Sequence, residues 1–150
     1  MKNIFNADDC NEIIDRLEKL TPATPQLWGK MNASQMMAHC NVSYEMVYEN
    51  IHPKPNFFMK FILKAFIKKK VTNDVLYKPN LPTAPAFVVS DEKDFEKEKT
   101  RLIQHIKKTQ ELGPAYFENK ESHSFGILKA TEWNNMFYKH IDHHLKQFGL

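Results

Sequence analysis

The sequence has few cysteines, few glycines, little net charge and no long apolar run. Two cysteines cannot build a disulfide framework, so we expect a reducing compartment, the cytoplasm. A net charge of +3 and the lack of a recognisable module argue against nucleic-acid binding. No apolar run approaches the roughly 18 to 20 residues of a membrane span, and no signal-peptide apolar region is present. We therefore expect one globular domain over residues 1–150.

Apolar residues recur with the roughly 3.6-residue period of a helix in four long segments. Asn32 and Gln35 suit a capping box, whereas Gly113 and Pro114 predict a helix end. Four long helices predict an all-α fold, a four-helix bundle with a long crossover between the second and third helices. The predicted long helices cover residues 8–20, 32–50, 91–112 and 131–148.

The crossover is predicted to contain a short extra helix, residues 57–71, and a proline-containing extended piece, residues 77–89. The short helix combines phenylalanines with many lysines. Such a helix can contact an anionic membrane surface or a partner. Alternatively, its aromatic side caps the bundle while the lysines stay solvated. The second arrangement is the more common one, so we expect no membrane contact.

Three histidines fall within five positions of the last predicted helix. His140 and His144 are four residues apart and project from one helix face, the apolar one, while His143 lies towards its edge. His39 lies on the second predicted helix. Buried imidazoles left unpaired cost roughly 1 to 3 kcal/mol each. A shared metal ion would satisfy these rings, and so would separate hydrogen bonds to carbonyls or other side chains.

If a metal binds, imidazole ligands suit Zn²⁺, Ni²⁺, Cu²⁺ or Fe²⁺. Three protein ligands with an open position are typical of catalytic sites, where the ion acidifies water or takes a thiolate. Cys40 faces away from His39 and is predicted to be a packed thiol. Asp142 is predicted to be a solvated charge, and His105 a surface or boundary residue. Further candidates, as supporting or pocket-lining residues, are Gln35, Gln147, His143 and His123.

Three segments carry a resemblance to a known family. They are WGKMNASQMMAHC at residues 28–40, FGIL at 125–128 followed by Glu132-Trp133, and HIDHHLKQFG at 140–149. In order and separation they resemble the DinB/YfiT-like superfamily of metalloenzymes, in particular a bacterial branch of unknown function. The resemblance implies a four-helix bundle, often dimeric, with a metal held at His39, His140 and His144. Related members include thiol-dependent transferases that use bacillithiol, mycothiol or glutathione, and a maleylpyruvate isomerase.

The sequence and the resemblance together predict a metal-dependent enzyme with a small-molecule substrate. The predicted cofactor is a divalent metal, Zn or Ni, and the reaction is that of a thiol-dependent transferase or of a hydrolase. A homodimer is implied by the resemblance. The alternative is a non-catalytic bundle protein that acts by binding a partner or a membrane surface.

Overall fold

The computed structural model describes residues 1–49 and 51–150, most of which are helical. The chain is therefore mostly helical, as predicted, with a long segment between α2 and α5. The elements, in order, are α1 (Ala7–Glu18), α2 (Ala33–Tyr48), α3 (Phe57–Ile62), the π-helical turn η1 (Leu63–Ile67), α4 (Lys68–Thr72), the 3-10 turn η2 (Pro85–Phe87), α5 (Phe95–Phe117), β1 (Lys120–Ser122), β2 (Gly126–Leu128) and α6 (Ala130–Gln147).

The first two helices begin at asparagine caps. The Asn6 side chain accepts hydrogen bonds from the backbone of Asp8 and Asp9 at the start of α1. At α2, Asn32 and Gln35 each accept a hydrogen bond from the other's backbone, so the predicted capping box is confirmed. These bonds pair donors that the first helical turn leaves free. The predicted end of this helix, Asn50, lies outside the described residues.

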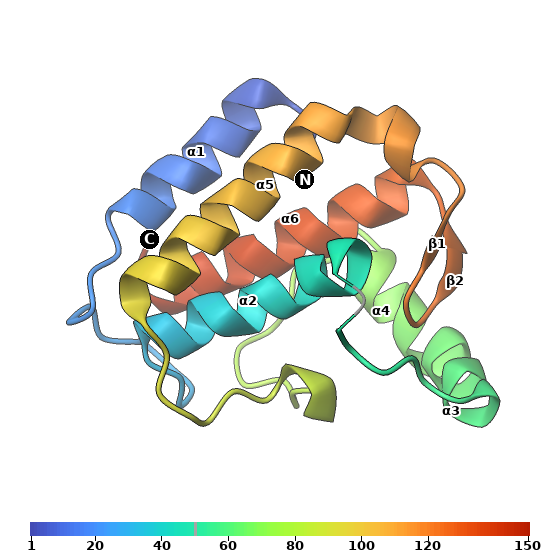
Figure 1. Cartoon of the computed structure of the whole chain (residues 1–150), viewed down its shortest axis with the longest axis horizontal. Helices are drawn as coiled ribbons and strands as arrows, with labels where there is room; N and C mark the ends of the chain where they lie inside the picture. The colour runs from blue at the N-terminus through green and yellow to red at the C-terminus, as the bar shows by residue number, and fades with distance from the viewer. Residues whose placement is uncertain (50) are drawn as a thin grey trace.

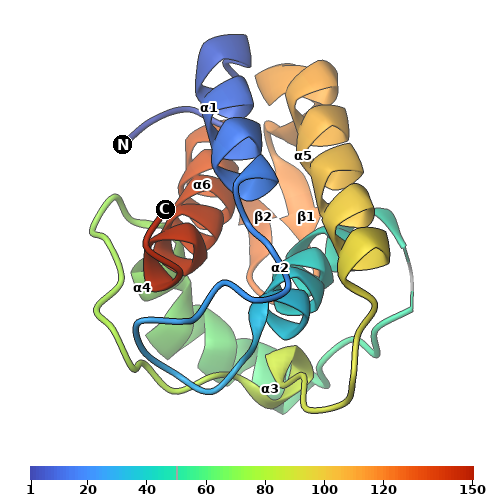
Figure 2. The ribbon, with the colours of Figure 1, turned by 90° about the vertical axis from the view of Figure 1, so that its left-hand side faces the viewer.

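The helices α1, α2, α5 and α6 pack around one apolar core (Figures 1 and 2). A stack of aromatic rings joins α2 to α6: the Tyr44 and Phe137 centroids are 4.7 Å apart and their planes are nearly parallel. Trp133 extends the stack at 5.5 Å from Phe137, and Phe117 makes an edge contact with Phe137 at 5.8 Å. Rings of this size remove much apolar area from water. The stack therefore fixes the two helices that carry the candidate histidines.

The predicted range of the third long helix is wrong at both ends. The observed helix, α5, is capped by the Asp94 side chain and begins at Phe95. The helical backbone breaks at Gly113, where φ is 68° and ψ is 175°, but helix resumes at once to Phe117. Pro114 permits this, because a proline in the first turn of a helix loses no hydrogen bond. The extra turn buries Phe117 in the core.

A short hairpin before α6 was not predicted. Strands β1 and β2 pair antiparallel, and the Ser122 hydroxyl accepts from the Phe125 backbone at 2.9 Å and donates to the Gly126 carbonyl at 2.8 Å. Strands of three residues are too short for an alternating pattern to reveal them. The predicted extended piece, residues 77–89, forms no strand: its backbone is extended at Ala84 and Val88, and the short turn η2 between them was not predicted.

The helical segment 57–72, formed by α3, η1 and α4, lies at the edge of the molecule (Figure 1). Its range agrees with the prediction. Salt bridges attach it to the body, from Lys60 to Glu121 at 2.8 Å and from Lys68 to Glu132 at 3.3 Å. The aromatic side does not cap the core, however: the exposed rings are Phe57, Phe58, Phe61 and Phe66. In the described parts of the chain, no helix combines the length and apolarity needed to cross a membrane.

A buried lysine ties the end of α4 to α6. The Lys139 ammonium donates to the carbonyls of Lys70 and Asn73 and to the Asn73 side-chain oxygen, at 2.8 to 2.9 Å. Asn135 of the same helix donates to the Thr72 carbonyl at 2.9 Å. The start of the following loop is thereby held against the helix that carries His140 and His144.

His105 is buried, which corrects the prediction of a surface or boundary position. Its Nδ1 donates to the Asn41 side-chain oxygen at 3.0 Å, and its Nε2 lies 3.2 Å from a Glu49 carboxylate oxygen. Burial lowers the pKa of this imidazole. Asn41 lies on α2 and Glu49 follows its last residue, so no local pattern around His105 reveals these partners.

Candidate metal centre

Three histidines from two helices meet in the structure. His39 of α2 and His140 and His144 of α6 each offer one ring nitrogen, and these three atoms all lie within 4.8 Å of one another. His39 and His144 are buried, and His140 is half-buried. The aromatic stack between α2 and α6 sets this approach. The structure thus brings together the three residues that the sequence singled out as metal ligands.

The outward nitrogen, Nδ1, of each ring has its own partner. Such bonds fix the orientation of an imidazole and turn its Nε2 towards a common centre, the arrangement that metal-binding histidines use. The Nε2 atoms of His39 and His140 are 2.9 Å apart. The Nδ1 partners are the Phe87 carbonyl for His39 at 2.7 Å, the Ser43 hydroxyl for His140 at 2.9 Å and the Gln147 side-chain oxygen for His144 at 2.8 Å.

Two of these partners also set the tautomer of the ring. The Phe87 carbonyl can only accept a hydrogen bond, so a neutral His39 carries its proton on Nδ1 and has a free electron pair on Nε2. The Gln147 amide nitrogen donates to the Trp28 carbonyl at 2.7 Å, which leaves the amide oxygen to accept from His144. His144 therefore also has its Nε2 electron pair free.

Ser43 can act either way, because a hydroxyl both donates and accepts. If Ser43 donates to Nδ1 of His140, Nε2 of His140 carries the proton and donates to His39 across the 2.9 Å contact. If Ser43 accepts, Nε2 of His140 has a free electron pair like the other two rings. In the first tautomer the rings of His39 and His140 are hydrogen-bonded to each other, and a change of tautomer at His140 leaves three Nε2 electron pairs free to bind a metal ion.

All three imidazoles are held in the neutral form. Burial is the main cause, and it lowers the pKa of His39, lowers that of His144 to about 3 and lowers that of His140 well below its usual value. The neighbouring rings add to the effect, since three positive charges cannot share so small a space. Neutral imidazole is the form that binds a metal ion.

The donor set fits a late divalent transition metal. With Zn–N bonds of about 2.0 to 2.1 Å, the ligand nitrogens of a tetrahedral zinc ion lie roughly 3.3 Å apart, a separation within the 4.8 Å limit that the three donors share. A set made only of imidazoles suits Zn²⁺ or Ni²⁺ better than Mg²⁺ or Ca²⁺, which take oxygen ligands. Three protein ligands leave one coordination position open.

A phenylalanine that was not predicted covers the cluster. Phe87, in the turn η2, makes edge contacts with the rings of His39 and His140, at centroid distances of 5.5 and 5.9 Å. The same residue supplies the carbonyl that accepts from His39. The proline-containing loop therefore places both an apolar cover and an orienting acceptor over the site. The only signal in the sequence is an aromatic residue two positions after Pro85.

His143 points to a different environment from its neighbours. Its ring lies between Trp28 and Tyr77, at centroid distances of 5.8 and 5.6 Å, and contacts the ring of His144 at 5.1 Å. His143 is thus a neighbour of the cluster that packs among aromatic side chains. It does not belong to the converging set.

Gly29 explains the tryptophan-glycine pair before α2. Its φ of +83° lies in the left-handed region that favours glycine. A Cβ atom at this position would stand 2.5 Å from the amide nitrogen of Gln147. The missing side chain therefore lets Gln147 reach the Trp28 carbonyl while its oxygen holds His144.

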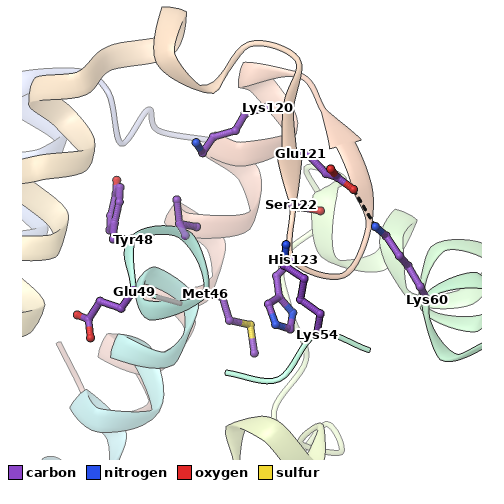
Figure 3. Close-up of a pocket in the computed structure, with 10 residues that line it drawn as sticks. Met46, Tyr48, Glu49, Lys54, Lys60, Lys120, Glu121, Ser122 and His123 are labelled. Atoms are coloured by element: carbon purple, nitrogen blue, oxygen red, sulfur yellow. Dashed lines mark hydrogen bonds and ion pairs between the residues drawn. The ribbon is translucent and has the colours of Figure 1, made fainter. Parts of the chain in front are cut away.

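The structure places the other two candidates away from the cluster. Gln35 serves the capping box, and its amide nitrogen donates to the Asp91 carbonyl at 3.2 Å. His123 lines a cavity of about 240 Å³, where Lys60 reaches towards Glu121 (Figure 3). The cavity is lined by residues 46–49, 54, 60 and 120–123, so it shares no residue with the three histidines.

The sequence also predicted the burial of Cys40 and the exposure of Asp142. Cys40 is buried, and burial raises the pKa of its thiol, so the predicted packed thiol is confirmed. Asp142 was predicted to be solvated, and this is wrong: it is 4% exposed and pairs with Arg16 at 2.9 Å and Lys146 at 2.7 Å. Arg16 comes from α1, at the other end of the chain, which is why the local pattern did not reveal the pair.

Comparison with known proteins identifies a family without a function. No curated protein and no solved structure matches this chain. A family model described as "Protein of unknown function (DUF1569)" matches residues 2–149. Because this match covers nearly the whole sequence, the chain belongs to the DUF1569 family of proteins of unknown function.

Proposed function

We propose that this protein is a metal-dependent enzyme whose divalent ion, zinc or nickel, is held by His39, His140 and His144. One observation carries the proposal: three neutral imidazoles each bring one ring nitrogen within 4.8 Å of the other two, while a separate partner holds each Nδ1. We further propose that α1, α2, α5 and α6 form a four-helix bundle of the DinB/YfiT-like kind. The resemblance in the three sequence segments supports this assignment.

The proposed reaction is a thiol-dependent transfer or a hydrolysis of a small molecule. When bound, a divalent ion among three neutral ligands would supply the charge that favours a thiolate or lowers the pKa of water. The residues of the chain control access. The ring of Phe87 packs edge-to-face with the rings of His39 and His140, so a small molecule that reaches the ion would pass this phenylalanine.

Metal content tests the site itself. Untagged protein, purified without a nickel column, is analysed for elemental composition beside a His140→Ala/His144→Ala variant. We expect about one metal ion per chain in the unaltered protein and none in the variant. His123→Ala is the matched control, because His123 lies outside the cluster, and it should keep its metal. If the unaltered protein contains no metal and takes up none from added Zn²⁺ or Ni²⁺, the proposal is wrong.

The two reaction types are separated by a second assay. The metal-loaded protein is incubated with an electrophile and with bacillithiol, mycothiol or glutathione, and the free thiol is titrated over time. Thiol loss that disappears in the His140→Ala/His144→Ala variant supports a transferase. Hydrolysis of activated esters without any thiol, lost in the same variant, supports a hydrolase. If the metal-loaded protein shows neither activity, it is not an enzyme of these two classes.

A further inference from the structure

The helical segment 57–72 exposes large aromatic rings. Phe57 is 89% exposed, Phe58 70%, Phe61 63% and Phe66 67%. The rings of the core, by contrast, are almost fully buried. Single exposed apolar residues are normal on a protein surface, but several on one short helix indicate an interaction surface.

The π-helical turn η1 changes the relative direction of two of these rings, Phe61 and Phe66. A turn closed by i→i+5 bonds takes up about one residue more than an α-helical turn. Phe61 and Phe66 are five residues apart in sequence, and the extra residue makes their spacing equivalent to about four, which places them on one face. Lys60 and Lys68, by contrast, pair with acidic residues of the body. The segment is therefore attached through lysines while its aromatic rings stay exposed.

Free positive charge accompanies the rings. No acidic residue occurs between positions 54 and 73. Lys64, Lys69 and Lys70 are exposed, and within the described part of the chain they form no salt bridge. The segment, which Figure 1 shows running outward from α4 to α3, thus carries exposed apolar rings and, among the described residues, ammonium groups without a salt bridge.

We propose that this segment docks on an anionic membrane surface, with the phenylalanine rings in the boundary between headgroups and acyl chains and the lysines against acidic headgroups. Charge complementarity favours an anionic membrane over a second copy of the chain. A second copy of the chain would bring lysines against lysines, which costs energy unless other charges intervene. The expectation of no membrane contact depended on the rings packing against the core, and they do not.

Vesicle co-sedimentation tests the proposal. The full-length protein is mixed with vesicles of phosphatidylcholine alone or of phosphatidylcholine with phosphatidylserine. We expect binding to the anionic vesicles only, weakened by salt. A lysine beside such a surface contributes about a fivefold gain in binding, so Lys64→Glu/Lys69→Glu/Lys70→Glu should lose at least about 100-fold. Phe57→Ser/Phe58→Ser/Phe61→Ser should lose at least about 10-fold.

The matched control reverses three lysines elsewhere, Lys19→Glu/Lys97→Glu/Lys107→Glu, and changes the net charge equally. All three are exposed; Lys19 follows the end of α1, and Lys97 and Lys107 lie on α5. The control should keep its binding to within about threefold. Circular dichroism verifies that every variant is folded. The proposal is overturned if the unaltered protein ignores anionic vesicles, binds neutral ones equally well, or loses as much binding in the control. It is also overturned if the phenylalanine variant abolishes a dimer while vesicles never bind.

Discussion

Gly29 and Gln147 lie so close together that a Cβ atom on residue 29 would stand 2.5 Å from the Gln147 amide nitrogen. The two residues are far apart in sequence, in the loop before α2 and at the end of α6. Their contact matters because the Gln147 amide links the Trp28 carbonyl to Nδ1 of His144. A small change in the loop can therefore alter the orientation of His144, because the Gln147 amide contacts both.

We predict that Gly29→Ala weakens metal binding by about 10- to 100-fold, the usual effect of losing a residue that orients a metal ligand. The added methyl group displaces Gln147, and His144 loses its orienting acceptor. Zinc affinity measured by competition with a chromogenic chelator provides the test. Gly113→Ala is the matched control: Gly113 also has a positive φ, 68°, but has open space around its Cβ position. Equal zinc affinity in both variants would contradict the proposed link.

The helices and the paired histidines could be predicted because their signals are local. Asn32 and Gln35 are three residues apart, and His140 and His144 are four apart, so helix geometry alone relates them. The partners that orient the histidines could not be predicted in the same way. Phe87 and Ser43 reach the cluster through the fold, and nothing in the neighbouring sequence marks a carbonyl or a hydroxyl for this role.

The polar residues whose burial was not predicted are paired with residues far away in the chain. Asp142 and His105 were expected outside the core because a charged or polar side chain is normally solvated. Each is buried because a partner from a distant helix meets it, Arg16 for Asp142 and Asn41 for His105. The phenylalanines of α3 show the opposite error, since they are exposed although apolar. Periodicity identifies a helix but does not say which neighbour its sides will meet.

We predict that Lys139→Met lowers the free energy of unfolding by about 2 to 4 kcal/mol. Lys139 is fully buried, and its ammonium satisfies three oxygen atoms of Lys70 and Asn73. Burial lowers its pKa to about 8, so the group still carries its proton in neutral solution. Urea unfolding provides the measurement, with the exposed Lys107→Met as control, expected within about 0.5 kcal/mol of the unaltered protein. A similarly small change for Lys139→Met would show that these bonds do not hold α4 to α6.

We predict that both thiols are unreactive in the folded protein. Cys10 and Cys40 are 3% and 1% exposed, and burial raises the pKa of each thiol, so little thiolate forms and reagents cannot reach it. Ellman's reagent at pH 8 should react at least on the order of 100-fold faster with the unfolded chain. Ser90→Cys introduces an exposed thiol and should add one fast-reacting group. Rapid reaction of a native cysteine in the unaltered protein would mean that its helix opens readily.

The hydroxyl groups of Tyr44 and Tyr48 provide a paired test of the core. Tyr44 is buried, and its hydroxyl has no hydrogen-bond partner among the residues that the structure describes. The Tyr48 hydroxyl bonds to Thr109 at 2.7 Å. A buried polar group without a partner costs free energy, whereas a made bond contributes about 1 kcal/mol.

We therefore predict opposite effects from the same chemical change. Tyr44→Phe should raise the free energy of unfolding by roughly 0.5 to 2 kcal/mol, because it removes an unpaired hydroxyl and keeps the ring stacked on Phe137. Tyr48→Phe should lower it by about 1 kcal/mol, because Thr109 loses its donor. Urea unfolding, measured on the two variants under the same conditions, tests both predictions. A loss of more than about 1 kcal/mol in Tyr44→Phe would show that its hydroxyl is bonded in the folded protein.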